Sequence, residues 1–164
     1  MRAVQVVLGV LVLALGVAAG VLWSDLRALR GAETAGREAV AAAKAIAPEL
    51  LSYDYRTVER DLARAGKHTT GALTRQYAEL SGSLAAKARE RRTIQTATVV
   101  AAAVERAEAD RVEVLLFVNT GTVTGAEGKA EARQQMSRTR ARFVMVRQDG
   151  RWLVSDLSTL IGTA

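Results

Sequence analysis

The chain has 164 residues, of which 49% are hydrophobic, and it carries a formal net charge of +6. This length fits one modest domain with appendages and excludes a multidomain enzyme. The chain has no cysteine and only one histidine, His68, which excludes disulfides, a thiolate nucleophile and cysteine- or histidine-rich metal centres. We therefore expect no metal site and no cofactor.

The N-terminal segment is the most apolar part of the chain. Residues 3–23 contain Gln5 as their only strongly polar member, and as a helix they would extend about 31 Å, roughly one hydrocarbon core. A cleaved signal peptide is the alternative, but its apolar region would be shorter and its charged start longer than Met1-Arg2. We expect an uncleaved transmembrane anchor over 1–23, followed by a juxtamembrane segment over 24–36. The first part of that segment is either a continuation of the anchor helix or a short stalk.

The charges on either side of this segment bear on which side of the membrane the following domain would lie. Arg2 precedes the apolar run, whereas three arginines follow it closely: Arg27, Arg30 and Arg37. The positive-inside rule would then place the following domain in the cytoplasm. The residues by themselves leave the side of the membrane open.

Apolar residues at spacings of three and four predict three helices between residues 24 and 92. Their apolar faces are Val40, Ala43, Ala47, Leu50 and Leu51, then Val58, Leu62 and Ala65, then Leu73, Tyr77, Leu80, Leu84 and Ala88. Pro48 should kink or break the last turn of the first helix. Thr57 and Thr70 are candidate caps of the second and third helices, and Gly66 should end the second.

The hydrophobic period then changes to two, which predicts four antiparallel strands over residues 93–105, 111–119, 134–147 and 151–157. A loop rich in Gly and Thr over 120–131 joins the second strand to the third. Asp149-Gly150 predicts a tight hairpin between the last two strands. That register places four large residues on one face, which we expect to be the core: Phe143, Met145, Trp152 and Val154.

Three helices followed by four strands indicate an α+β fold. We expect residues 37–164 to form one domain, in which three helices pack on a curved four-stranded antiparallel sheet.

The opposite face of the last hairpin is the candidate contact surface for a partner. It combines a basic row with an apolar stretch: Arg138, Arg140, Arg142, Val144, Val146 and Leu153. The alternatives are a solvated face whose arginines pair with acids such as Glu113, a contact with protein or anionic lipid, and a nucleic-acid backbone. Only seven aromatic residues are present, so a stacking platform for bases is missing and we expect no nucleic acid.

The clusters that suggest catalysis have simpler structural interpretations. Tyr53-Asp54-Tyr55 combines a carboxylate with tyrosine donors, as ketosteroid isomerase does, but Asp54 beside Thr57 also suits a turn or a cap. His68 follows Gly66-Lys67 in a polar turn, where a solvated histidine is expected. We expect no catalytic residue, and three further acids should flank a hairpin turn: Glu105, Glu108 and Asp110.

Several short motifs resemble those of actinobacterial Mce-associated membrane proteins, which accompany the mammalian-cell-entry lipid transporters. The motifs are Leu51-Ser52-Tyr53-Asp54-Tyr55-Arg56-Thr57, Asp61-Leu62, Thr70-Gly71, Tyr77, Val114-Leu115-Leu116-Phe117-Val118-Asn119 and Trp152-Leu153-Val154-Ser155-Asp156-Leu157. Pro48 and Thr120 depart from the family pattern. The resemblance implies a single-pass anchor and an extracytoplasmic domain with a cone-shaped fold like that of nuclear transport factor 2, also described as cystatin-like.

The resemblance also implies a function and an orientation. It implies a non-enzymatic accessory protein that docks on or stabilises an Mce-type lipid import complex in the cell envelope, with the C-terminal domain outside the cytoplasm. The partners would be the membrane, subunits of the transporter and, in a homo-oligomer, a second copy of the chain. The rivals are an inner-membrane assembly factor of a type IV secretion-like system, which shares the cone shape, a lipid-binding module and a cone-fold enzyme.

Overall fold

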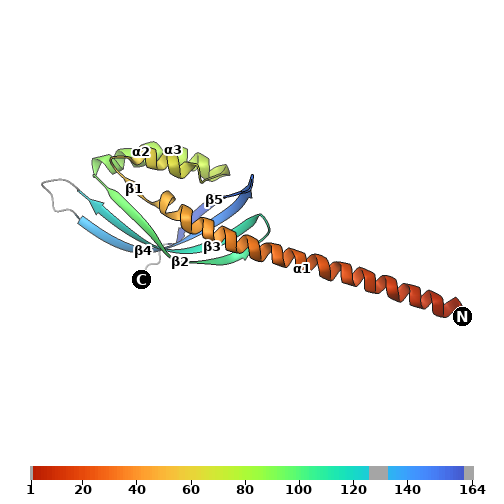
Figure 1. The fold of residues 1–164 in the computed structure, drawn as a ribbon. Helices are drawn as coiled ribbons and strands as arrows, with labels where there is room; N and C mark the ends of the chain where they lie inside the picture. The colour runs from red at the N-terminus through yellow and green to blue at the C-terminus, as the bar shows by residue number, and fades with distance from the viewer. Residues whose placement is uncertain (1, 126–132, 161–164) are drawn as a thin grey trace.

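The protein forms one layer of helices on one curved sheet (Figure 1). The computed structural model describes residues 2–125 and 133–160. The helices are α1 (Arg2–Leu51), α2 (Val58–Gly66) and α3 (Gly71–Glu90). The strands are β1 (Tyr53–Asp54), β2 (Ile94–Ala107), β3 (Arg111–Thr124), β4 (Arg133–Gln148) and β5 (Arg151–Leu160), and they pair antiparallel in the order β1-β2-β3-β4-β5.

The C-terminal part of α1 packs on the inner face of the sheet through small side chains. Buried alanines recur every four residues along this helix at Ala35, Ala39, Ala43 and Ala47. This spacing places them in one row, and their small size allows the helix axis to approach the strands closely. The approach is also close at Gly36, where an added Cβ would lie 3.2 Å from the Val104 side chain.

The large residues of the core come from alternate positions of β3, β4 and β5. They are Val112, Val114, Leu116, Val118, Phe143, Met145 and Val154, all fully buried or nearly so. Trp152 is half-buried against this cluster, and the Arg147 guanidinium lies 4.8 Å from its ring centroid while also pairing with Glu38 of α1. The predicted core face of the last hairpin is therefore confirmed.

The turn between β4 and β5 explains this register. Asp149 and Gly150 both have positive φ, at 49° and 75°, as a two-residue hairpin turn of the favoured twist requires. Gln148 pairs with Arg151 and Met145 with Val154, as the sequence predicts.

The prediction of four strands was wrong, because the sheet has five. The missed strand, β1, has only two residues, which pair with Ile94 and Gln95 of β2. Two residues are too few to show a period of two, so no alternation could reveal it. The loop expected over 120–131 is also shorter, since β3 continues to Thr124, and its remainder at 126–132 lies outside the described residues.

The prediction of a transmembrane helix at the N-terminus is corrected as well. Within the part of the chain that the structure describes, no helix is long and apolar enough to cross a membrane. The apolar run is not a separate element, because α1 continues without a break through residue 24 into the domain, and its described part carries Arg27, Arg30 and Glu33. The side chains of most residues before Trp23 lie outside the described part of the chain.

The two shorter helices agree with the sequence in position but not in every contact. α2 buries Val58, Leu62 and Ala65 as expected and ends at Gly66. Neither Thr57 nor Thr70 caps its helix through the side chain. Leu80, expected on the buried face of α3, is 62% exposed, whereas Leu73 and Ala88 of the same predicted face are buried.

We predict that the two phenylalanines differ sharply in their contribution to stability. Phe143→Ala empties a fully buried site and should lower the free energy of unfolding by about 3–5 kcal/mol. Phe117→Ala, the matched control on the outer face of the same sheet, should cost much less because this side chain is 42% exposed. Urea unfolding of the purified variants measures both, and equal losses would contradict the assignment of the two faces.

Candidate partner-binding face of the sheet

The six predicted contact residues lie on the outer face of the sheet, which the helices leave uncovered. Because side chains alternate along a strand, the residues between the buried positions of β4 point outward. On β3 their neighbours are Asn119 beside Arg138, Phe117 beside Arg140, Leu115 beside Arg142, Glu113 beside Val144 and Arg111 beside Val146. Leu153 of β5 lies beside Val146.

The apolar half of this surface is less accessible than the sequence indicates. Val144 is only 7% exposed, and Val146 and Leu153 are half-buried. The pairing of β4 with β5 shifts at Val144, where the Ser155 hydroxyl donates a hydrogen bond to the Val144 carbonyl at 3.1 Å. The centre of the predicted apolar stretch therefore offers little surface to a partner.

The three arginines of the row have different environments. Arg142 donates a hydrogen bond to the Glu105 carboxylate at 2.7 Å, and its Nε atom is buried without a hydrogen-bond partner. Arg138 and Arg140 are exposed, and neither forms an ion pair with a residue that the structure describes. Two cationic groups thus remain available on this face.

Two exposed apolar residues beside these arginines were missed from the sequence. Phe117 is 42% exposed and Val100 is 63% exposed. The alternation of β3 was a sufficient signal for Phe117, because Val114, Leu116 and Val118 occupy the other face. Val100 is the extra residue of a bulge between Val99 and Ala101, and no sequence pattern predicts a bulge there.

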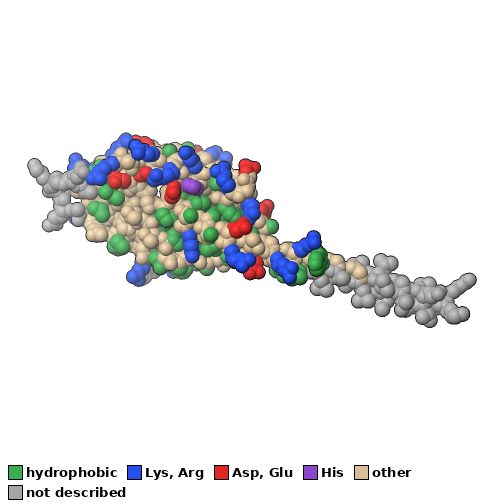
Figure 2. All heavy atoms as spheres, viewed as in Figure 1, with side chains coloured by type: hydrophobic (Ala, Val, Ile, Leu, Met, Phe, Trp, Pro, Cys, Tyr) green, Lys and Arg blue, Asp and Glu red, His purple; other side chains and the backbone are tan. Residues whose placement is uncertain are grey.

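These residues enclose a depression of about 600 Å³ on the outer face. We call it the basic depression, and its outward-facing lining consists of Val100, Ala101, Phe117, Asn119, Arg138 and Arg140. Charges on the helical side of the molecule are mixed instead, since Figure 2 shows Lys and Arg there interspersed with Asp and Glu. The basic depression thus combines two exposed arginines with exposed apolar surface.

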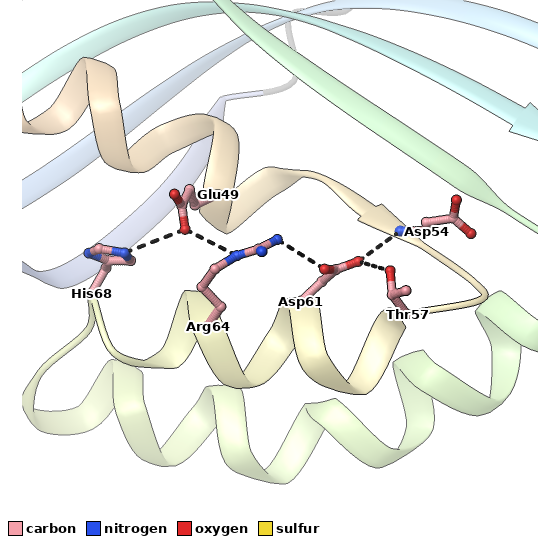
Figure 3. A network of polar contacts seen from close by, with 6 residues as sticks. All are labelled: Glu49, Asp54, Thr57, Asp61, Arg64 and His68. Atoms are coloured by element: carbon pink, nitrogen blue, oxygen red, sulfur yellow. Dashed lines mark hydrogen bonds and ion pairs between the residues drawn. The ribbon is translucent and has the colours of Figure 1, made fainter.

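A chain of polar contacts joins the end of α1 to α2 (Figure 3). Glu49 Oε2 lies 3.3 Å from Arg64 Nε and 3.5 Å from His68 Nε2. Arg64 in turn donates to Asp61 Oδ1 at 2.9 Å. The sequence indicated a solvated histidine at this position, whereas the structure holds His68 beside the Glu49 carboxylate.

The same chain of contacts continues to β1. Asp61 Oδ2 accepts hydrogen bonds from the Thr57 hydroxyl at 2.7 Å and from the Asp54 amide at 3.2 Å. The Asp54 carboxylate accepts the Arg56 amide at 2.9 Å, and the Asp54 carbonyl accepts the Thr57 amide, so Asp54 organises a turn as expected. These acids hold secondary-structure elements together, and the described residues contain no group of acids or histidine that could hold a metal ion.

Two acids lie at the turn of the β2–β3 hairpin, where their backbone groups form hydrogen bonds. The Glu108 amide donates to the Arg111 carbonyl, and the Asp110 carbonyl accepts the Arg147 amide at 2.8 Å. Their predicted place in a hairpin turn is confirmed.

Two tyrosines near this junction are shielded from water. Burial raises the pKa of Tyr53, and burial raises the pKa of Tyr77 to about 12. The Tyr77 hydroxyl donates a hydrogen bond to the Leu50 carbonyl at 2.6 Å, which satisfies one of the free carbonyls at the end of α1. Tyr77 thus fastens α3 to α1.

We predict a measurable role for this hydroxyl at alkaline pH. Because the folded-state pKa of Tyr77 lies above its usual value, its contribution to stability is complete below about pH 10 and is lost as the pH rises toward 12. Tyr77→Phe should lower the free energy of unfolding by about 1 kcal/mol at neutral pH. The variant should also lose less stability between pH 10 and 12, and superimposable stability curves for the two proteins would contradict this role.

The chain has close relatives in Mycobacterium tuberculosis, although no family model matches it. It is 36% identical over 152 residues to outer membrane protein Rv1973, and this alignment covers 92% of this chain and 91% of Rv1973. It is 31% identical over 163 residues to the protein Rv1362c, and this alignment covers 96% of this chain and 71% of Rv1362c.

Solved structures of type IV secretion proteins share the fold. Agrobacterium tumefaciens VirB8 matches with a TM-score of 0.56 at 9% identity, over 76% of this chain and 90% of that one. Helicobacter pylori CagV, a VirB8 homologue, matches with a TM-score of 0.55 at 8% identity, over 73% and 94%. The solved structures also include the periplasmic domain of DotI, with a TM-score of 0.57 at 14% identity, over 73% and 91%. The relatives thus include named membrane proteins, and the shared fold is that of periplasmic domains; association with an Mce complex stays a prediction.

Proposed function

We propose that this protein is a non-enzymatic accessory protein that holds other proteins together in the bacterial cell envelope. The chain belongs to the same family as outer membrane protein Rv1973 of Mycobacterium tuberculosis. The observation that carries this proposal is the outer face of the sheet. It offers Arg138 and Arg140, which form no ion pair with the residues that the structure describes, beside exposed Phe117, a combination typical of protein interfaces.

The environment of the possible catalytic groups supports a non-enzymatic role. Asp54 and His68 are both engaged in contacts between α1, β1 and α2. The basic depression contains arginine, asparagine and apolar side chains but no general base. The groups available on this face suit recognition rather than proton transfer.

A type IV secretion-like assembly is the complex that the fold favours. VirB8 and its homologue CagV share the arrangement of helices on one curved sheet, at identities that support the fold alone. By analogy with the periplasmic domains among these structures, the domain would lie outside the cytoplasm and would act by binding neighbouring subunits or a second copy of itself.

An Mce-type lipid import complex is the second candidate. The observation that favours it is the set of motifs at 51–57, 114–119 and 152–157, which resemble those of Mce-associated proteins. Both candidates require the same kind of surface, so the identity of the bound subunits distinguishes them.

We predict that the tagged full chain, extracted from its native host in mild detergent, co-purifies with a defined set of cell-envelope proteins. Mass spectrometry against an unrelated tagged membrane protein identifies this set. Conjugation or secretion components would support the type IV assembly, and transporter subunits would support the Mce complex.

Purification of the chain without any specific companion would contradict the proposal. Turnover of a small substrate that Asp54→Asn abolishes without changing the melting temperature would establish an enzyme instead.

A further inference from the structure

We propose that the basic depression binds an extended acidic segment of a partner protein, with two carboxylates on Arg138 and Arg140 and an apolar side chain against Phe117. This inference rests on the proposed function and names the chemistry of the partner. The proposed contact with the partner lies at Val100 and Phe117, which are exposed, rather than at Val144, which is buried.

The spacing of the two arginines matches an extended segment. Arg138 and Arg140 are two residues apart on β4 and point to the same face, so their Cα atoms are separated by about 6.6–6.8 Å. Acidic side chains at alternate positions of an extended chain have the same spacing. Each guanidinium can then donate two parallel hydrogen bonds to one carboxylate, the geometry that arginine favours.

The distribution of ion pairs along β4 explains why these two arginines, unlike Arg142 and Arg147, are available. Arg142 is paired with Glu105 and Arg147 with Glu38. Arg138 and Arg140 have no acidic partner among the described residues, although they are neighbours of the same charge. An anionic ligand would remove this repulsion, whereas water alone leaves it in place.

The apolar side of the depression favours a segment that alternates acidic and apolar residues. Phe117 lies opposite Arg140 in the strand register, and exposed Val100 borders the same depression from β2. Arginine and aromatic residues next to each other are typical anchors of protein interfaces. Asn119, opposite Arg138, adds a group that can donate to and accept from a backbone.

An anionic membrane fits this face less well than a protein segment. Glu113 and Asp156 lie beside Val144, four residues along β4 from Arg140, which corresponds to about 13 Å. A flat layer of acidic headgroups would cover both ends of the face and meet these carboxylates. A narrow segment contacts the basic end alone.

A second copy of the chain bound face to face fits less well for a similar reason. A two-fold axis through the basic depression would bring the same two arginines of both copies together. The resulting repulsion between four guanidinium groups disfavours that contact.

The test is site-specific photocrosslinking of the full chain in its native host. p-Benzoylphenylalanine replaces Phe117 in one protein and Leu80, an exposed residue of α3, in the control. We expect an adduct from position 117 but not from position 80, and mass spectrometry should map it to a partner segment with acidic residues on both sides of an apolar one. Adducts that map to a second copy of the chain, or to segments without acidic residues, would overturn the inference.

Charge reversal makes the test specific for the two arginines. In the Phe117 crosslinking background, Arg138→Glu with Arg140→Glu should remove most of the adduct. The matched control, Arg60→Glu with Arg75→Glu, makes the same charge change on exposed positions of α2 and α3 and should leave the adduct intact. Arg138→Gln with Arg140→Gln should weaken it to an intermediate degree, and melting temperatures confirm that each variant is folded. An adduct that survives the reversal would overturn the inference.

Two further outcomes separate this inference from the proposed function. Co-purification of envelope proteins without any adduct at position 117 overturns the inference and leaves the proposed function standing, whereas the absence of both overturns the two together. Flotation of the full chain with phosphatidylglycerol vesicles, lost in the Arg138→Glu, Arg140→Glu protein while no protein adduct forms, would assign the depression to a lipid surface instead.

Discussion

The packing of α1 on the inner face of the sheet is the constraint on which the rest of the structure depends. The row formed by Ala35, Ala39, Ala43 and Ala47 brings a helix close to the strands, and Phe143 and Leu116 fill the space that these small residues leave. Larger residues in the row would push the helix away from the core, since a closely packed interior has no spare volume. The helix thereby covers the central part of the inner face, whereas the helices leave the outer face uncovered.

The outer face acquires its chemistry from the same strands that build the core. Alternation along β3 and β4 means that each buried residue fixes the direction of its exposed neighbour, so Leu116 and Val118 inside require Phe117 outside. The bulge at Val100 then adds an apolar side chain that regular alternation would not supply. Core and contact surface are thus two consequences of one register.

The sequence predicted the parts of this arrangement that local rules determine. The period of two and the Asp149-Gly150 turn were enough to place Phe143 in the core, and helical spacing was enough to predict the buried face of α2. β1 escaped because two residues carry no period, and the burial of Val144 depends on a register shift with β5 that alternation does not reveal. The apolar N-terminal run was interpreted from its length and composition as a membrane anchor, whereas the structure shows it as part of α1, one continuous helix whose C-terminal part packs on the sheet.

The row of arginines shows most clearly why a contact surface needs the fold. In the sequence Arg138, Arg140 and Arg142 are equivalent. In the structure Glu105 of β2, two strands away, forms an ion pair with Arg142 only. Glu113 and Asp156 lie on either side of Val144 farther along the face, where Arg111 also lies beside Val146. The charges at that end are therefore mixed, whereas the charged residues that line the basic depression are both arginines. The unequal pairing of three identical side chains thus determines where on the face positive charge remains available to a partner.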